Sequence, residues 1–150
     1  MTLRTPTLLA LVAATAAAGC GSSSTSPLSK SELVAKGDAI CKRVNDGIRN
    51  VGPTNTAADV AKVAPKVYAL EQQGVNDLRK LTPPGAVASD YTSFLDKTQV
   101  LTDDANKIGA AAKTNDKKTA QTIASEAASA SASATSSASK LGFKDCAHQN

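Results

Sequence analysis

The feature that most constrains the fold is a long run of mostly apolar side chains spaced alternately four and three residues apart. Its positions are Val87, Tyr91, Phe94, Thr98, Leu101, Ala105, Ile108 and Ala112. In an α-helix this spacing puts all of them on one face, because 3.6 residues complete each turn. Such a helix must bury its apolar face against other elements. The run therefore predicts one member of a helical bundle.

Two earlier segments show similar spacing between signals for helix ends. A capping-box pattern begins at Ser29, and Gly52-Pro53 ends the helix that it opens. A second such pattern begins at Thr56, and the helix it opens ends before Thr82-Pro83-Pro84-Gly85. Pro65 lies within this second helix. It predicts either a kink or a first-turn position after a short separate turn.

A fourth helix is predicted after the break at residues 114–116, with Gly142 as its terminator. Residues 124–139 are almost wholly alanine and serine, a composition also typical of disordered linkers. Helix is favoured because alanine has the highest helix propensity and the apolar spacing continues. Short connections make sequential helices antiparallel neighbours. We therefore expect residues 30–150 to form an all-α, up-down-up-down four-helix bundle.

The beginning of the chain has the layout of an export signal. Arg4 precedes an apolar run from Leu8 to Ala18, and Gly19-Cys20 follows. This order predicts a bacterial lipoprotein signal peptide over residues 1–19, with Cys20 as the lipidated first residue of the mature chain. Residues 16–18 also fit an ordinary A-x-A cleavage site, which would release a secreted protein.

Residues 20–29 are rich in serine and fit a flexible tether between a lipid and a folded domain. The tether favours the lipid anchor, so we expect the protein on the extracytoplasmic side of the cell membrane. Membrane attachment would come through an acyl modification such as palmitate. The alternative localisation is secretion.

The cysteines Cys41 and Cys146 remain after Cys20. In an oxidising compartment they are expected to form one disulfide. In the predicted topology the end of the fourth helix returns toward the first, which allows the two to meet. Free thiols and metal ligation are the alternatives, and metal ligation lacks further ligands at suitable spacing.

Four short motifs resemble those of small exported actinobacterial proteins, often lipoproteins, that have no established function. The motifs are Asp38-Ala39-Ile40-Cys41, Leu78-x-x-Leu81-Thr82-Pro83-Pro84, Tyr91-x-x-Phe94-Leu95 and Leu141-Gly142-x-x-x-Cys146. The resemblance covers most of residues 30–147. It implies a helical bundle whose two end cysteines are paired, and it transfers no catalytic or binding residues.

The residues needed for common enzyme chemistry are missing from the sequence. His148 is the single histidine, and it lies near the end of the chain. No nucleophile motif, phosphate loop or Glu-x-x-His pair occurs. We expect no enzyme activity, no metal and no cofactor. Nucleic-acid binding is also disfavoured, because the scattered basic residues have no stacking aromatic partners.

The remaining hypotheses concern binding. The leading one is a non-enzymatic binding or interaction module of the cell envelope, whose partner is an envelope protein. An alternative is a carrier or sensor of a small apolar ligand held between helices by Tyr68, Tyr91 and Phe94. A structural envelope protein without a specific ligand is the third. Glu71 lies near the apolar face of its helix, and we expect it to reach solvent or pair with a cation rather than hold a ligand.

Overall fold

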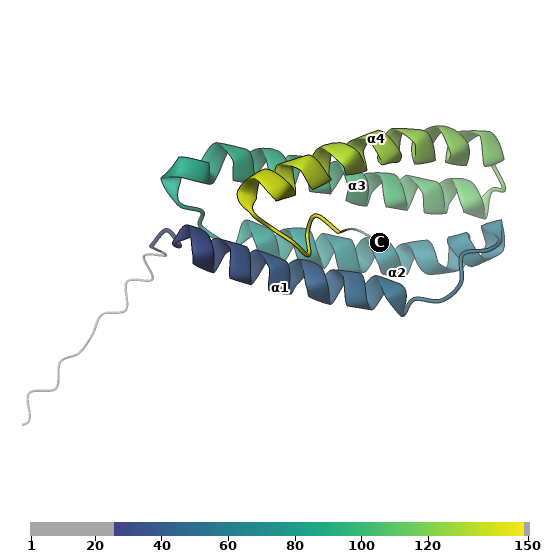
Figure 1. Cartoon of the computed structure of the whole chain (residues 1–150). Helices are drawn as coiled ribbons and strands as arrows, with labels where there is room; N and C mark the ends of the chain where they lie inside the picture. Colours follow the sequence, from purple (N-terminus) through teal and green to yellow (C-terminus); the bar gives the residue numbers. More distant parts are fainter. Residues whose placement is uncertain (1–25, 149–150) are drawn as a thin grey trace, which may run out of the picture.

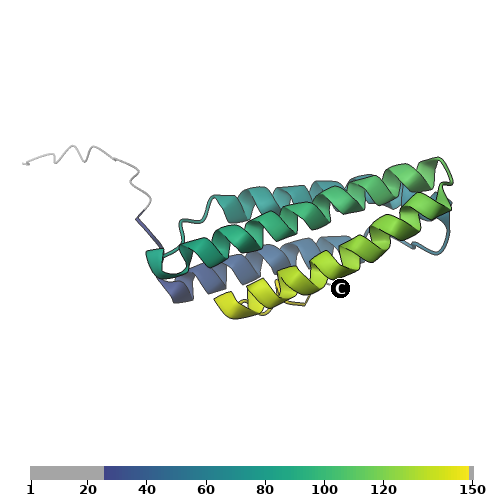
Figure 2. The same ribbon diagram turned by 90° about the horizontal axis from the view of Figure 1, so that it is seen from above.

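The computed structural model describes residues 26–148, and within them the chain forms four long helices (Figures 1 and 2). Successive helices run in opposite directions, which confirms the predicted up-down-up-down bundle. A short 3₁₀ helix precedes the third long helix. The elements are α1 (Lys30–Arg49), α2 (Ala57–Arg79), η1 (Gly85–Val87), α3 (Ala88–Lys113) and α4 (Lys117–Leu141).

The helix ends lie where the sequence signals place them. Ser29 and Glu32 form a reciprocal capping box, in which the Glu32 backbone N–H donates to Ser29 Oγ at 3.2 Å and the Ser29 N–H donates to Glu32 Oε2 at 2.9 Å. Thr56 and Asp59 repeat this arrangement at the start of α2. Gly142 ends α4 with a left-handed φ of 93°, which glycine adopts without a steric penalty from a side chain.

Two ambiguous segments are now resolved as helix. α2 continues without a break through Pro65, so the alternative of a first-turn proline after a separate turn is wrong. The alanine- and serine-rich segment belongs to α4, as expected from its propensity and spacing. Small side chains in this segment allow α4 to approach α3 along much of its length.

The core lies near the end of the bundle where α4 finishes. Tyr91 and Phe94 are almost completely buried there, and the ring centroid of Phe94 is 5.4 Å from that of Phe143. The Tyr91 hydroxyl donates to the Leu78 carbonyl oxygen at 2.7 Å, which satisfies the buried polar atom. The buried members are Leu33, Leu78, Tyr91, Phe94, Ala138, Leu141, Phe143 and Cys146.

The chain after α4 crosses toward α1 (Figure 1). Cys146 forms a disulfide with Cys41 of α1, and their Cα atoms are 5.1 Å apart, which confirms the predicted pairing. The backbone N–H groups of Lys144 and Asp145 also donate to the Asp38 carboxylate at 2.9–3.1 Å. The C-terminal segment, residues 143–148, is thus fastened to α1 by a covalent bond and by hydrogen bonds.

Close packing of α2 against α3 depends on Gly109. A Cβ atom at this position would overlap the methyl group of Ala64, a rigid neighbour. Gly109→Ala is expected to lower the free energy of unfolding by about 1–2 kcal/mol, because the overpacking cost exceeds the roughly 1 kcal/mol gained in helix propensity. Chemical denaturation measures the change.

A compensating substitution provides the control. Ala64→Gly removes the methyl group that the new side chain meets, so the double variant should recover stability beyond the sum of the single effects. Additive effects of the two substitutions would show that α2 and α3 do not touch at this point.

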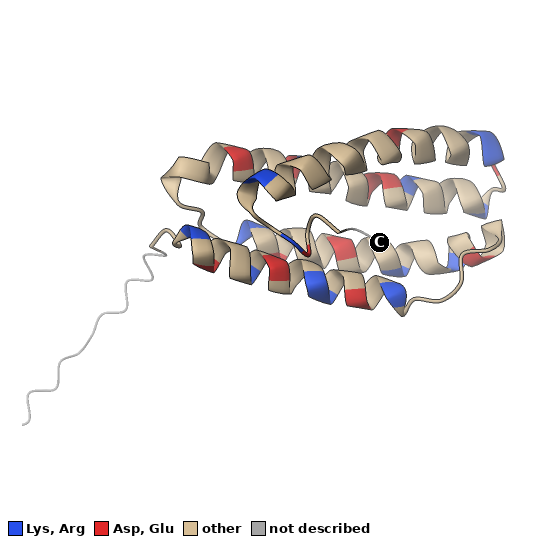
Figure 3. Ribbon diagram, viewed as in Figure 1, with Lys and Arg blue, Asp and Glu red and all other residues tan. Residues whose placement is uncertain are grey.

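Basic and acidic residues are interspersed along the four helices (Figure 3). On α1, Asp46 pairs with both Lys42 and Arg49, and Arg43 pairs with Asp77 of α2 at 2.5 Å. Such exposed pairs contribute little to stability individually. Among residues 26–148, no helix is long and apolar enough to cross a bilayer.

Candidate functional site

A pocket of about 110 Å³ lies between α1, α2, α3 and the C-terminal segment. Six of its fourteen wall residues are aliphatic, the disulfide forms one side, and five wall residues are polar. The apolar wall residues are Ile40, Val44, Ile48, Val75, Leu78 and Leu101. The others are Cys41, Cys146, Gly74, Asn45, Glu71, Thr98, Thr102 and Asp145.

The pocket exists because the apolar face of α1 is covered only in part. Leu33 and Gly37 near the start of α1 are buried, whereas Val44 and Ile48 farther along are only partly buried. α2 and α3 contact each other extensively, and so do α3 and α4, but α1 makes fewer contacts with α2. The C-terminal segment closes the side between α4 and α1, and the hollow remains beneath it.

Glu71 is the charged residue that enters this pocket from α2. Its Oε2 atom is buried and has no hydrogen-bond partner within residues 26–148, and no cation pairs with the carboxylate there. The side chain as a whole is only partly buried, which agrees with the expected contact with solvent, but the expected alternative of a cation partner is not found among these residues. The reason is geometric: Glu71 is on the part of α2 that faces the uncovered half of α1.

Burial raises the pKa of the Glu71 carboxyl from its ordinary value of 4.5 to about 7. Desolvation is the cause, with no contribution from a neighbouring charge. The wall residues from α1 and α3 include no ionisable group, since Cys41 is held in the disulfide, and the C-terminal segment contributes Asp145. Both ionisable residues of the wall are therefore acids, and no lysine, arginine or histidine lines the pocket.

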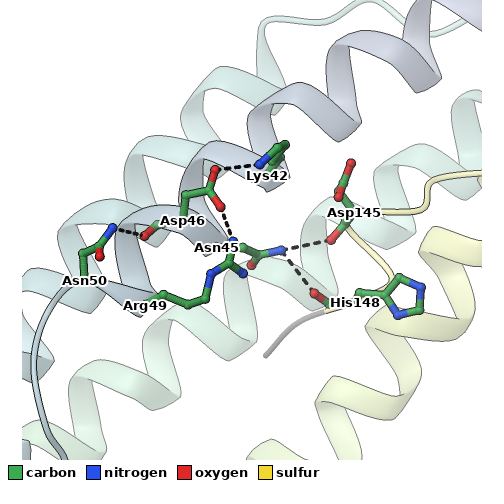
Figure 4. A network of polar contacts seen from close by, with 7 residues as sticks. All are labelled: Lys42, Asn45, Asp46, Arg49, Asn50, Asp145 and His148. Carbon is green, nitrogen blue, oxygen red and sulfur yellow. Dashed lines mark hydrogen bonds and ion pairs between the residues drawn. The ribbon is translucent and has the colours of Figure 1, made fainter.

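The hydrogen-bond donors of the wall already have acceptors. The Thr98 hydroxyl donates to the Phe94 carbonyl at 2.9 Å, and the Thr102 hydroxyl donates to the Thr98 carbonyl at 3.1 Å. Asn45 Nδ2 donates to the carbonyl oxygens of Asp145 and His148 at 3.1 and 3.2 Å (Figure 4). What the wall still offers to a ligand is therefore acceptor capacity, above all the Glu71 carboxylate.

A second buried acceptor without a partner lies on α3, at its contact with α2. Gln99 Oε1 on α3 has no donor among the described residues, although its amide nitrogen donates to Gln72 Oε1 at 3.2 Å and to Asp103 Oδ1 at 3.0 Å. Gln72 follows Glu71 directly. Gln99 does not line the Glu71 pocket, so the two unsatisfied acceptors do not belong to one site.

The predicted site residues do not gather around this pocket. Tyr91 and Phe94 are 2% and 0% exposed and belong to the aromatic core, and Tyr68 is partly buried but does not line the pocket. Cys41 and Cys146 do line it, as its disulfide wall. Cys20 lies outside the described residues.

A second hollow, of about 130 Å³, lies at the other end of the bundle between α2, α3 and the start of α4. Its wall is mainly alanine and aliphatic, and it contains no buried polar atom that lacks a partner. Within residues 26–148, no group of three or more metal-binding side chains comes together. The Glu71 pocket is accordingly the better candidate for a binding site.

Comparison of the chain with protein-family models found no match, and searches of curated proteins and of solved structures likewise found none.

Proposed function

We propose that this protein is a lipid-anchored, extracytoplasmic and non-enzymatic binding module, and that the Glu71 pocket is its binding site. The export signal with Cys20 and the serine-rich tether support the anchor. The short motifs that resemble those of exported actinobacterial proteins, often lipoproteins, are consistent with this placement. In this proposal the bundle is a rigid support that holds the pocket outside the cytosol.

The observation that carries the binding role is the partly buried Glu71 side chain, whose Oε2 atom is buried without a partner in a pocket with six aliphatic wall residues. A buried carboxylate oxygen without a hydrogen-bond partner costs about 1–3 kcal/mol relative to a satisfied one. A hydrophobic side chain of similar volume would remove that cost. Keeping a carboxylate there is understandable if it meets a ligand, since pockets with apolar walls and a few polar groups are typical of small-molecule sites.

Native mass spectrometry of the protein released gently from its own host membranes tests this function. Binding predicts an additional mass that is lost on denaturation. A stoichiometric protein partner after crosslinking, with no small molecule, would instead favour the protein-interaction alternative. Finding neither would favour a purely structural envelope role.

The anchor has its own test. Cys20→Ala removes the thiol that accepts the lipid, so the variant should leave the membrane fraction or accumulate unprocessed, whereas Ser22→Ala in the tether should have no effect. Fractionation and intact mass measure both outcomes. Membrane association of the processed Cys20→Ala chain at the wild-type level would contradict the lipid anchor.

A further inference from the structure

We propose that the ligand of the Glu71 pocket is a small organic cation, an ammonium group on a short apolar chain, with the ammonium bound to the Glu71 carboxylate. This inference rests on the proposed binding function and specifies the class of its ligand. Three properties of the pocket support it: the kind of hydrogen-bonding atom it leaves free, the sign of its charges and its size.

The first property is the shortage of donors. The hydroxyl groups of Thr98 and Thr102 and the Asn45 amide nitrogen all donate within the protein. The buried Glu71 Oε2 has no donor. A ligand that fits must therefore bring hydrogens of its own, and an ammonium group brings three donors and no acceptor.

The second property is the sign of the charge. The two ionisable residues of the wall, Glu71 and Asp145, are both acids. An anionic ligand would meet like charge without any compensating cation in the wall, which makes its binding unfavourable. A cation gains a charge-assisted hydrogen bond to the buried Glu71 Oε2 atom, and such bonds are stronger than those between neutral groups.

The third property is the combination of size and apolar surface. A dry cavity of about 150 Å³ accommodates benzene, so the pocket of about 110 Å³ has room for roughly five non-hydrogen atoms. The aliphatic wall, including Ile40, Val44 and Leu101, offers few hydrogen bonds to a cluster of waters. An alkyl chain of about four carbons fits this wall and leaves its ammonium group for the carboxylate.

Methyl NMR spectra of the full mature chain test the inference with three probes of similar size: n-butylammonium, n-butanol and butyrate. Saturable shifts of the Ile40, Val44 and Leu101 methyl groups report binding in the pocket. The Ile123 methyl group on α4 is the internal reference, because it does not line the pocket. We expect butylammonium to bind at least about tenfold more tightly than butanol, and butyrate not to bind.

A matched pair of variants tests the role of the carboxylate. Glu71→Gln should weaken butylammonium binding at least about tenfold by removing the charge. Glu126→Gln makes the same chemical change at an exposed position on α4 outside the pocket and should leave binding unchanged. Binding should also tighten as the pH rises through about 7, since the deprotonated Glu71 holds the cation.

The results that would contradict the proposal distinguish the class of ligand from the binding function itself. If butanol or butyrate bound as tightly as butylammonium, the inference that the ligand is a cation would be wrong, but the pocket would still be a ligand-binding site. The absence of pocket shifts with all three probes would overturn the cation inference, and the mass of the host-purified protein would then decide the binding function independently.

Discussion

Replacing Cys41 and Cys146 together by alanine is expected to lower the free energy of unfolding by about 4.7 kcal/mol, the largest loss we predict for this protein. The two residues are 105 positions apart, so the disulfide closes nearly the whole folded chain into one loop. Without this loop the unfolded chain gains conformational entropy, which stabilises it relative to the folded state.

The loss should be large for this fold in particular. Its buried core contains several alanines, and alanine contributes little apolar area, at about 25 cal/mol per Å². Without the disulfide, the C-terminal segment is held to α1 by the Asp38 and Asn45 hydrogen bonds and by the packing of Phe143. The variant should therefore lose this segment and the wall of the pocket before the rest of the bundle unfolds.

Urea denaturation of the wild type, the double variant and the reduced wild type measures the effect. Reduction should lower the midpoint of the wild type toward that of the double variant and leave the variant itself unchanged. A double variant as stable as the oxidised wild type would contradict the stabilising role of the disulfide.

The second large expected effect is a fall in the stability of the wild type as the pH rises toward 7. Glu71→Gln should abolish this fall. The pKa of Glu71 is about 7 in the folded protein and close to 4.5 in the unfolded chain. Between these values the folded state keeps a proton that the unfolded state has lost. Stability that is fully present below pH 4.5 therefore falls as the pH rises toward 7 and stays low above it.

The size of this loss follows from the shift. Each pKa unit corresponds to about 1.4 kcal/mol, so the wild type should lose about 3 kcal/mol across this interval. Other carboxylates act with the opposite sign and at lower pH, because hydrogen bonds to neighbours lower their pKa and their contribution disappears on acidification. They are Glu32, Asp46, Asp77 and Asp116.

Denaturation at a series of pH values from 4.5 to 8 tests this expectation. Glu71→Gln cannot ionise, so its stability should stay nearly level over this range and exceed that of the wild type at pH 8. Glu126→Gln should keep the slope of the wild type. A wild type without a decline toward pH 7 would show that the Glu71 carboxyl is hydrated or paired in solution.

The helices could be predicted well from the sequence because each signal is local. The capping boxes at Ser29 and Thr56, the glycine after α4 and the apolar spacing of α3 need only neighbouring residues to act. The disulfide could be predicted as well, since the topology returns the end of the chain to α1. Pro65 remained ambiguous because a proline alone does not say whether its helix is interrupted.

The pocket could not be predicted in the same way, because its wall comes from four separate segments. The spacing of Val44 and Ile48 indicates an apolar face, but it does not reveal that the neighbouring helices leave this face partly uncovered. Tyr91 and Phe94 drew attention as aromatic residues and are core residues instead. The available signal was Glu71, a carboxylate on the apolar side of its helix.

The titration of the Glu71 carboxyl is the most direct test of a desolvated acid without a cation partner in the pocket. The chain contains three glutamates, so the ¹³C resonances of their carboxyl groups can be assigned by comparison with Glu71→Gln. Followed over a pH titration of the ligand-free protein, the Glu71 resonance should show a midpoint of about 7. A midpoint near 4.5 would contradict the burial of the carboxylate and with it the binding site that we propose.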